Sequence, residues 1–382
     1  MEMMLLEDCC DILDSMRVPI TANDRKKGPY PYYGANGIQD YVADYIFDDE
    51  LVLLAEDGGN FGSEERPIAY KVSGKCWVNN HAHVLKPKVG IDVDYLCYSL
   101  MFYKVDGMVN GATRMKLTQA AMRKMLIPSR NIEEQKEIAR ILNKVQMLIK
   151  KEKEQIERLD ELIKSRFVEM FGMPGTDVKG WGNTVLGNCC VLNPKKGQDV
   201  RLQSGMRVSF IPMPAISENG NIDASETKLY DEVKTGFTYF SENDVLFAKI
   251  TPCMENGKGA VAVGLCNGIG FGSTEFHVIR PIEDISNPYW LYYLTTFDSF
   301  RNDAAANMSG SAGQRRVPVT FLDKYKVSLP PIELQNQFAT FVHQTDKLKV
   351  TNTLKADIDI ICGLIEKSSQ IKTVEEVELY VA

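Results

Sequence analysis

Hydrophobic residues recur every three or four positions through a long stretch in the middle of the chain, residues 132–170. The residues between them are mostly Lys, Arg and Glu, and the stretch contains neither Pro nor Gly. A sustained 3.5-residue repeat predicts a long helix with an apolar seam that a second helix must cover. From residue 138 to 170 such a helix is roughly 48 Å long. The apolar seam positions are Ile138, Leu142, Val145, Ile149, Ile156, Leu159, Ile163 and Met170, and Glu152 and Arg166 are the polar ones.

The sequence contains two copies of one plan. The run HVLKP at 83–87 recurs as HVIRP at 277–281, and four further apolar positions agree at the same offset. Near the end of each copy, a strand-like run ending in proline is followed by IEEQ at 132–135 or IELQ at 332–335. Agreement over so many positions in one order predicts a duplicated unit, each copy followed by a helix. The four matching positions are Ile91, Tyr95, Tyr98 and Leu100 in the first copy and Ile285, Tyr289, Tyr292 and Leu294 in the second.

The second helix is expected from residue 332 onwards and is less regular than the first. Each helix carries an apolar stripe, and the nearest partner for one stripe is the other. If the two globular units lie at opposite ends, the helices pair as an antiparallel coiled coil, which gives a pseudo-two-fold molecule. The apolar positions of the second stripe are Phe338, Phe341, Leu348, Ile358, Ile361 and Ile365.

Each globular unit mixes short strand-like runs with turns and a short helix. In the first unit we expect strands at 50–55, 75–78 and 83–85 and a helix at 94–101. In the second we expect strands at 244–248 and 276–279 and a helix at 289–294. The fold class is therefore α+β with a curved sheet in each unit. The predicted domains are residues 1–131, the first helix and linker at 132–173, residues 174–331, and the second helix and tail at 332–382.

Composition fits an ordinary globular protein of two or three domains, with 382 residues, 44% of them hydrophobic and 25% charged. The first ten residues predict no signal peptide, and no apolar run is long enough for a membrane helix. Nine cysteines without a CxxC pair favour reduced thiols in a cytoplasm. Zinc binding by the adjacent Cys9 and Cys10, or by His81 and His83, is the weaker alternative, because adjacent cysteines converge poorly on one metal.

Signals for catalysis are weak. No GxxxxGK[ST] phosphate loop is present. The run Asn287-Pro288-Tyr289-Trp290 is similar to an amino-methyltransferase motif, but it lacks the second proline. The first copy has Val93-Asp94-Tyr95 at that place. We therefore interpret the run as a helix start. A nuclease-like cluster, Asp223 with Glu226 and Lys228, is spaced too tightly and is interpreted as surface charge. His83 and His277 are expected to be core histidines. The sequence predicts no catalytic residue and no metal site in this chain.

Basic glycine-containing loops recur at corresponding places in the two copies, at 111–116 and 309–316. Glycine permits close backbone approach, Arg and Lys neutralise phosphates, and Arg and Gln also pair with base edges. The formal charge of −7 opposes a nucleic-acid partner, but the repetition of the loops favours DNA. The candidate DNA-contacting residues are Arg114, Lys116, Gln314, Arg315 and Arg316 in the loops, with Lys26, Lys27, Lys195, Lys196, Lys249 and Lys258 beside turns.

These motifs resemble the specificity subunit of type I restriction-modification enzymes over the whole chain. The sequences leading into the two helices, IP before IEEQ and LPP before IELQ, are similar to the family's LPPL-x-EQ, although Leu334 stands where the family has Glu. FGMPG at 171–175 and GW at 180–181 are similar to the family's linker and to the opening of its second recognition domain.

The resemblance implies two target-recognition domains, 1–131 and 174–331, each reading one half of a bipartite DNA sequence. The helices would set the gap and dock two modification (methyltransferase) subunits, which restriction subunits join. This chain would be a non-catalytic subunit without a cofactor, with S-adenosylmethionine in the modification subunit and ATP and Mg in the restriction subunit. Two alternatives stay open, a bivalent coiled-coil scaffold that does not bind DNA, and a self-contained methyltransferase.

Overall fold

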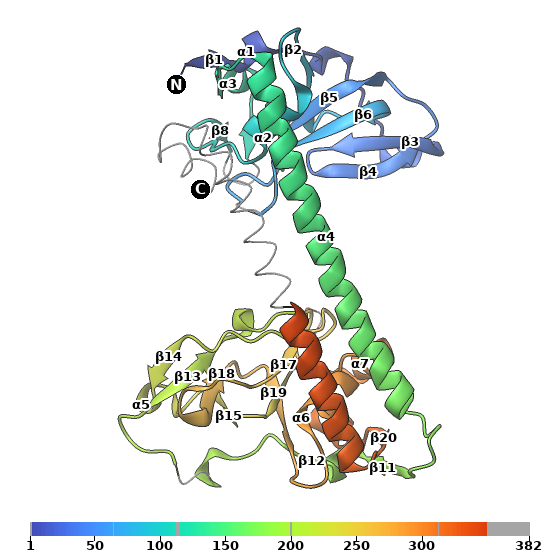
Figure 1. The fold of residues 1–382 in the computed structure, drawn as a ribbon, viewed down its shortest axis with the longest axis vertical. Coiled ribbons are helices and arrows are strands. Elements are labelled where there is room, and N and C mark those ends of the chain that lie inside the picture. Colours follow the sequence, from blue (N-terminus) through green and yellow to red (C-terminus); the bar gives the residue numbers. More distant parts are fainter. Residues whose placement is uncertain (1, 64, 112–114, 199–200, 312, 350–382) are drawn as a thin grey trace. The chain divides into compact units, whose positions relative to one another are not determined.

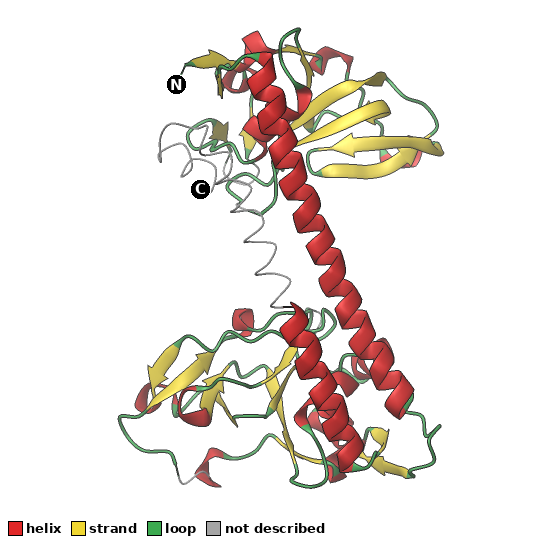
Figure 2. Cartoon of the chain, in the orientation of Figure 1, coloured by secondary structure: helices red, strands yellow, loops and turns green. Residues whose placement is uncertain are grey.

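The computed structural model describes residues 2–63, 65–111, 115–198, 201–311 and 313–349 (Figure 1). Contacts divide the chain into two compact units, Met1–Lys150 and Lys151–Ala382, which we treat separately. The long helix predicted from the hydrophobic repeat is α4 (Ile132–Phe171), which begins in the first unit and ends in the second. Both units combine helices and sheets (Figure 2), as the α+β prediction requires. None of the described helices has a stretch long and apolar enough to cross a membrane.

The elements of the first unit that precede α4 are, in chain order, β1 (Met3–Leu5), α1 (Leu6–Cys9), β2 (Cys10–Ile12), β3 (Lys27–Gly34), β4 (Gly37–Val42), β5 (Phe47–Ala55), β6 (Ala69–Val78), β7 (Ala82–Pro87), α2 (Val93–Met101), β8 (Val109–Asn110), β9 (Lys116–Leu117), α3 (Gln119–Met122) and β10 (Leu126–Pro128). A six-stranded sheet in the order β2-β7-β5-β6-β3-β4 forms its centre. Helix α2 packs against β5 and β6, and β1 pairs with β10. The expected strands and helix therefore correspond to β5, β6, β7 and α2.

The elements of the second unit that follow α4 are β11 (Asn183–Val185), β12 (Cys190–Leu192), β13 (Arg207–Ile211), β14 (Thr227–Leu229), α5 (Tyr230–Val233), β15 (Thr238–Ser241), β16 (Val245–Ala248), β17 (Gly259–Val261), β18 (Ile269–Gly272), β19 (Phe276–Pro281), α6 (Pro288–Leu294), α7 (Asp298–Ala306), α8 (Val319–Lys324), β20 (Lys326–Ser328) and a helix that begins at residue 332 and is described to 349. The expected strands and helix correspond to β16, β19 and α6.

The second unit repeats the topology of the first. The order β12-β19-β16-β17 reproduces β2-β7-β5-β6, and β13, parallel to β18 and next to β14, reproduces β3, parallel to β6 and next to β4. The pairing of β11 with β20 repeats that of β1 with β10. The difference is that two long strands are each replaced by two short ones, β5 by β15 and β16, and β6 by β17 and β18. The second unit therefore has two four-stranded sheets where the first has one sheet of six, and the predicted duplication is confirmed.

A buried glutamine joins each long helix to the unit that precedes it. The Oε1 atom of Gln135 accepts the N–H of Asp92 at 2.8 Å, and its Nε2 donates to the carbonyls of Gly90 and Arg130 at 3.0 and 2.9 Å. In the second unit, Gln335 makes the same three bonds, with the N–H of Asn287 at 2.9 Å and the carbonyls of Ile285 and Pro330 at 3.0 and 2.8 Å. The glutamine of the IEEQ and IELQ motifs is thus the residue that fixes the start of each helix.

The residue before each glutamine has a lesser role. Glu134 is exposed and lies 3.8 Å from Arg130, whereas Leu334 is half-buried against the core of the second unit. The substitution of Leu for Glu at this motif position therefore leaves the glutamine bonds intact.

Within the second unit, the two long helices pack antiparallel. The ring of Phe338 lies 5.4 Å from that of Phe167 and 5.5 Å from that of Phe171. Lys349 lies eleven residues after Phe338, and Asp160 lies eleven residues before Phe171. Lys349 Nζ is 2.6 Å from the carboxylate of Asp160. Residue numbers rise along one helix as they fall along the other, so the predicted antiparallel pairing is confirmed for the described residues.

The seam differs in detail from the 3.5-residue prediction. Ile163, Phe167 and Phe171 are the buried residues at the end of α4, so the apolar stripe steps by four there and passes Phe167 instead of Arg166. A straight helix of 3.6 residues per turn drifts in this direction against a strict heptad. Ile138 packs against the core of the first unit, and Phe338 is fully buried.

The remaining seam positions are less covered. Leu142, Val145, Ile156, Leu159, Met170 and Phe341 are half-buried, and Ile149 and Leu348 are 39% and 54% exposed. Ile358, Ile361 and Ile365 lie outside the described residues. The contribution of all these positions to docking a partner stays a prediction, as do the pseudo-two-fold arrangement and the proposed domain boundaries.

We predict that Gln335→Leu lowers the free energy of unfolding of the second unit by about 2–4 kcal/mol, because it leaves one N–H and two carbonyls, of which that of Pro330 is buried, without their partner. Gln337→Leu is the matched control, since Gln337 lies on the same helix and is exposed; there we expect a change within about 0.5 kcal/mol. Urea unfolding followed by tryptophan fluorescence measures both. Equal losses in the two variants would contradict the role given to Gln335.

Candidate nucleic-acid interface

The two basic loops end at equivalent places in the two units, beside the end of β5 in the first and the end of β16 in the second. In the first unit, the N–H of Leu117 donates to Glu56 O at 2.7 Å and that of Gly58 donates to Met115 O at 3.3 Å. In the second, the N–H of Val317 donates to Lys249 O at 2.9 Å and that of Thr251 donates to Arg315 O at 3.0 Å. These bonds tie the end of each loop to the residues that follow β5 or β16. The loops predicted to correspond are therefore structurally equivalent, and Arg316 is the counterpart of Lys116.

A buried histidine adds a side-chain bond at the same point. His83 Nε2 lies 2.9 Å from the carbonyl oxygen of Leu117, and His277 Nε2 lies 2.8 Å from that of Val317. Since a carbonyl oxygen only accepts, each Nε2 carries the hydrogen. The two rings are 1% and 6% exposed. They are core histidines, as predicted, and each holds the residue that follows the basic side chain of its loop.

The other nitrogen of each histidine has a different partner in the two units. His83 Nδ1 lies 2.6 Å from Asp14 Oδ2, whereas His277 Nδ1 lies 3.2 Å from Asn193 Nδ2. The remaining oxygen of each partner accepts a backbone N–H, that of Val84 at 2.9 Å or that of Val278 at 3.0 Å. A carboxylate in one unit and an amide in the other thus occupy the same position.

Burial and neighbouring groups shift the pKa of one residue in each pair, Asp14 in the first unit and His277 in the second. Burial favours a raised pKa for Asp14, but the hydrogen bond and charge of His83, with the Val84 N–H and Arg17, hold that pKa below its usual 3.8. In the second unit, burial lowers the pKa of His277 below its usual 6.5. His277 is therefore neutral at pH 7, donating from Nε2 and accepting the Asn193 amide at Nδ1.

A carboxylate holds the basic side chain of each loop. Lys116 Nζ lies 2.9 Å from Glu56 Oε1, and Arg17 Nη1 lies 2.6 Å from the other oxygen of Glu56. The guanidinium of Arg316 makes two bonds to Glu275, at 2.9 and 2.8 Å. Burial raises the pKa of Glu56, but Lys116 and Arg17 bring it below its usual 4.5, and Arg316 lowers that of Glu275. Lys116 and Arg316 thus present oriented, partly neutralised charges.

The other candidates near the second loop are also hydrogen-bonded. The guanidinium of Arg315 donates to the carbonyls of Ala305 and Met308 at 3.0 and 3.3 Å, at the end of α7, where a cation is favourable. Lys249 donates to Thr274 O at 2.7 Å, and burial lowers its pKa. Lys258 Nζ donates to the carbonyl of Met213 at 3.3 Å. The side chain of Gln314 is exposed, and its backbone carbonyl oxygen accepts a hydrogen bond from Arg316. Arg114 lies outside the described residues.

Four lysines lie away from the loop ends. Lys26 and Lys27 are exposed at the start of β3, whereas the far end of that strand adjoins the loop through a 3.0 Å bond from Asn36 to Gly58 O. Eight residues of strand separate these ends by roughly 25 Å. Lys195 is exposed, and Lys196 donates to Lys234 O next to α5. The structure therefore does not place Lys26 and Lys27 with Lys116.

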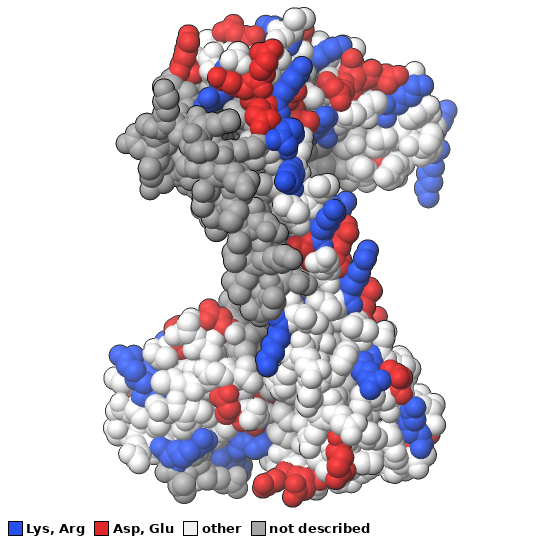
Figure 3. Space-filling model, viewed as in Figure 1, with Lys and Arg blue, Asp and Glu red and all other residues white. Residues whose placement is uncertain are grey.

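Surface charge is mixed. On the face drawn in Figure 3, basic and acidic side chains are interspersed over each unit among the coloured residues. Arg301, one of the bases that give the sequence around the second loop its positive charge, is half-buried and donates to the carbonyls of Thr295, Met254 and Gly257. It therefore supports the fold.

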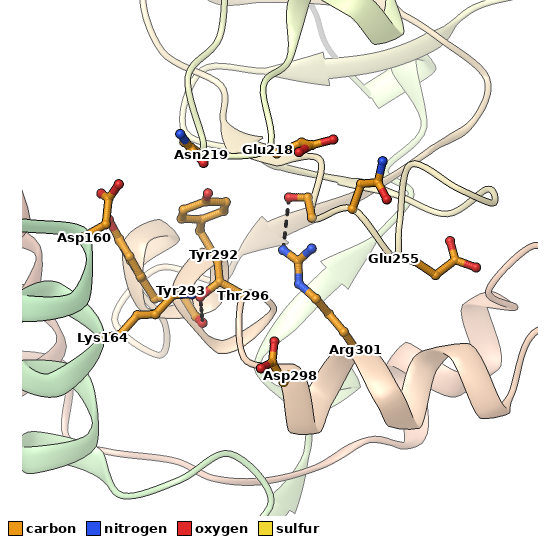
Figure 4. A pocket seen from close by; sticks show the side chains of 12 residues that line it. Asp160, Lys164, Glu218, Asn219, Glu255, Tyr292, Tyr293, Thr296, Asp298 and Arg301 are labelled. Atoms are coloured by element: carbon orange, nitrogen blue, oxygen red, sulfur yellow. Dashed lines mark hydrogen bonds between the residues drawn. The ribbon is translucent and has the colours of Figure 1, made fainter. Parts of the chain in front are cut away.

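A pocket in the second unit lies between α4, α6 and α7 (Figure 4). Four carboxylates line it, those of Asp160, Glu218, Glu255 and Asp298, against two bases, Lys164 and Arg301. This charge balance is unfavourable for a phosphate group, so the pocket is not part of the proposed DNA surface.

The motifs considered for other chemistry have structural roles. Asn287 caps α6, accepting the N–H of Tyr289, and Trp290 is buried, so the methyltransferase-like run is a helix start as interpreted. Lys228 lies over the ring of Phe210 and 3.4 Å from the carboxylate of half-exposed Glu226, so this run is surface charge as interpreted. Burial raises the pKa of Cys10 to about 12, which disfavours the thiolate that zinc requires. One group of described residues has metal-ligand types, Asp14, Glu56 and His83, and its carboxylates are bonded to Arg17, Lys116 and His83 itself.

The sequence alone did not identify the residues that hold the loops. Asp14, Asn193, Glu56, Glu275 and Arg17 come from segments far from the loops in the chain. One signal was present, because Asp14 and Asn193 both follow the repeated Cys-Cys pair closely. A polar residue at that place in both copies marks a shared contact.

We predict that Asp14→Asn, which gives the first unit the polar group of the second, lowers its free energy of unfolding by about 2 kcal/mol at pH 7. The pKa of Asp14 is depressed in the folded state, so its stabilisation is present above pH 4 and is lost as pH falls through the folded pKa. The difference between variant and wild type should therefore shrink between about pH 5 and pH 3. Urea titrations across that range measure it, with exposed Asp11→Asn as control. A difference independent of pH would contradict the charged role of Asp14.

Comparison with known proteins agrees with this architecture. The family model described as "Type I restriction modification DNA specificity domain" matches residues 1–158 and 189–359. The specificity subunit of the Escherichia coli type I restriction enzyme EcoAI is 36% identical over 209 residues, covering 52% of this chain and 35% of that protein. The EcoEI specificity subunit, also from E. coli, is 33% identical over 193 residues, covering 50% and 30%. The chain thus spans about a third of the length of these relatives.

A solved structure is similar over nearly the whole chain. The S subunit of a type I restriction-modification system from M. genitalium has a TM-score of 0.52 at 10% identity, covering 94% of this chain and 93% of that one. At this identity the likeness concerns the fold alone. Because the family model matches most of the sequence in two segments, and the structure has two units of one topology, this chain belongs to the type I restriction-modification DNA specificity family.

Proposed function

We propose that this chain is the sequence-specific DNA-binding subunit of a type I restriction-modification complex and that each unit reads one half of a bipartite target. The observation that carries the proposal is the repeated anchoring of a basic loop at the end of a central strand. The same backbone bonds and a buried histidine anchor it in both units. Two equivalent loops on two equivalent units are suited to two separate half-sites.

The charge arrangement supports reading of bases in addition to phosphate contact. A guanidinium held by a carboxylate on one side, as Arg316 is by Glu275, has a fixed direction and retains donors on its other side. Such a group can pair with guanine in the major groove. Lys116 carries a compact point charge and is half exposed, which is better suited to a phosphate than to a base edge.

The helices would provide spacing and docking. Since the glutamine joints fix each helix to its unit, helix length would set the distance between the half-sites. Two modification subunits would dock on this chain and supply S-adenosylmethionine, and restriction subunits would supply ATP- and Mg-dependent steps. In this proposal the chain itself does no chemistry.

The test is a gel-shift of the chain together with its modification partner against a library of random DNA. The proposal expects selection of two short sequences separated by a constant gap. No preference for any split sequence would overturn it. The rival, a scaffold that does not bind DNA, predicts that log affinity is flat against log salt, whereas phosphate neutralisation gives a steep slope.

We predict that Lys116→Gln weakens binding to all sequences alike and reduces the salt slope by about 1, as for one lost phosphate contact. Lys86→Gln is the matched control, because Lys86 is also paired with a carboxylate, that of Asp49 at 2.7 Å, but lies outside the loop. Fluorescence anisotropy over a salt series measures both. A changed base preference in Lys116→Gln would reassign this residue to base reading.

A further inference from the structure

The bond from a buried histidine to the loop backbone is the constant feature of two sites that otherwise differ. The Nδ1 partner is Asp14 in one unit and Asn193 in the other. The residue after the strand is Glu56 in one unit and Lys249 in the other, and the acid that holds the basic side chain comes from a different segment in each. The Nε2 bond to Leu117 O or Val317 O remains, at 2.9 and 2.8 Å.

This bond acts at the point where the loop leaves the sheet. The accepting carbonyl belongs to the residue directly after Lys116 or Arg316, and the N–H of the same residue is already tied to the strand end. Leu117 and Val317 are 0% and 1% exposed. With the backbone held on both sides of one residue, the direction of the preceding basic side chain is fixed to a rigid part of the unit.

A histidine required only to fill the core would not need the same acceptor twice. An apolar residue of similar size would fill the space without a polar group that must be satisfied. The acceptor is instead the same backbone atom of equivalent loops in both units, while the surrounding charges have been exchanged.

We propose that His83 and His277 are positioning residues for DNA reading, which act through Lys116 and Arg316, the basic residues at the ends of the loops, and do not touch DNA. This inference rests on the proposed function, since it assigns to each histidine the half-site selectivity of its own unit.

His277 is the better residue to test. His83 contacts the carboxylate of Asp14 at 2.6 Å, so an apolar substitution there would also remove one hydrogen-bond partner of a charged group. His277 is neutral and faces an amide, so a change removes only two neutral hydrogen bonds. His277→Leu keeps most of the volume and removes the donor. His277→Gln retains an N–H that reaches about as far as Nε2.

The experiment compares the wild type, His277→Leu and His277→Gln as full chains with the modification partner. Half-site selectivity is measured as the affinity ratio for matched over mismatched DNA, with the mismatch placed in either half. We expect His277→Leu to lose about tenfold in selectivity for one half only, with the other half as internal control, and His277→Gln to recover most of it. His343→Leu, an exposed histidine on the second long helix, is the matched control.

Hydrogen exchange provides a readout that does not depend on DNA. In His277→Leu the amides of Val317 and Thr251, which form the ladder at the loop end, should exchange about three- to tenfold faster, and in His277→Gln they should not. Unchanged exchange and unchanged selectivity in His277→Leu would overturn the inference, as would an equal loss in both halves. A wild type without any split preference would overturn the proposed function instead, and the exchange rates would still decide whether His277 holds the loop.

Discussion

The structure depends on a buried amide that satisfies three backbone groups at once, at the point where each long helix begins. Gln135 and Gln335 are 1% and 0% exposed, and each pairs with one N–H and two carbonyls of the unit before it. Without the glutamine, the three backbone groups at each joint would lose their hydrogen-bond partner, and the loss is most costly at the buried carbonyl of Pro330. An apolar contact could hold the helix against the unit, but it would not fix direction, since hydrophobic burial is non-directional. The directional bonds make helix and unit one rigid part, and in the proposed function the spacing of the two basic loops rests on it.

Comparison of the two units separates what the fold requires from what it tolerates. The strand order, the closing pair of terminal strands, the glutamine joint and the histidine bond to the loop are present twice. The charges around the loops are exchanged, with Glu56 replaced by Lys249 and an acid, Glu275, placed two residues before the histidine, where the first unit has His81. Two long strands of the first unit, β5 and β6, are each two short strands in the second. The charges around a loop can change because the charged groups of each unit pair with one another. The glutamine and histidine bonds are kept because they connect elements that are distant in sequence.

Much of this arrangement could be predicted from the sequence, because each feature occurs in two copies and agreement between the copies supports its assignment. The HVLKP and HVIRP runs identified β7 and β19, the glutamine motifs marked both helix starts, and the glycine loops were correctly matched. The seam drift to Phe167 was not predicted, since a heptad count assumes an ideal supercoil. Nor were the carbonyl partners of Arg301 and of Arg315, whose Nη2 donates to two backbone carbonyls; the DNA contact of Arg315 stays a prediction. Such assignments depend on which carbonyls tertiary packing brings near, and linear spacing does not contain that information. The loop residue Arg114 lies outside the described residues, so its assignment stays a prediction.

The central claim is that two equivalent units each read one half of a divided DNA target. Sequencing that detects modified bases, applied to DNA methylated by the complex of this chain with its modification partner, tests it most directly. We expect methylated adenines in two short sequences separated by a constant number of unspecified base pairs. Methylation within a single uninterrupted sequence, or at sites with a variable gap, would contradict it.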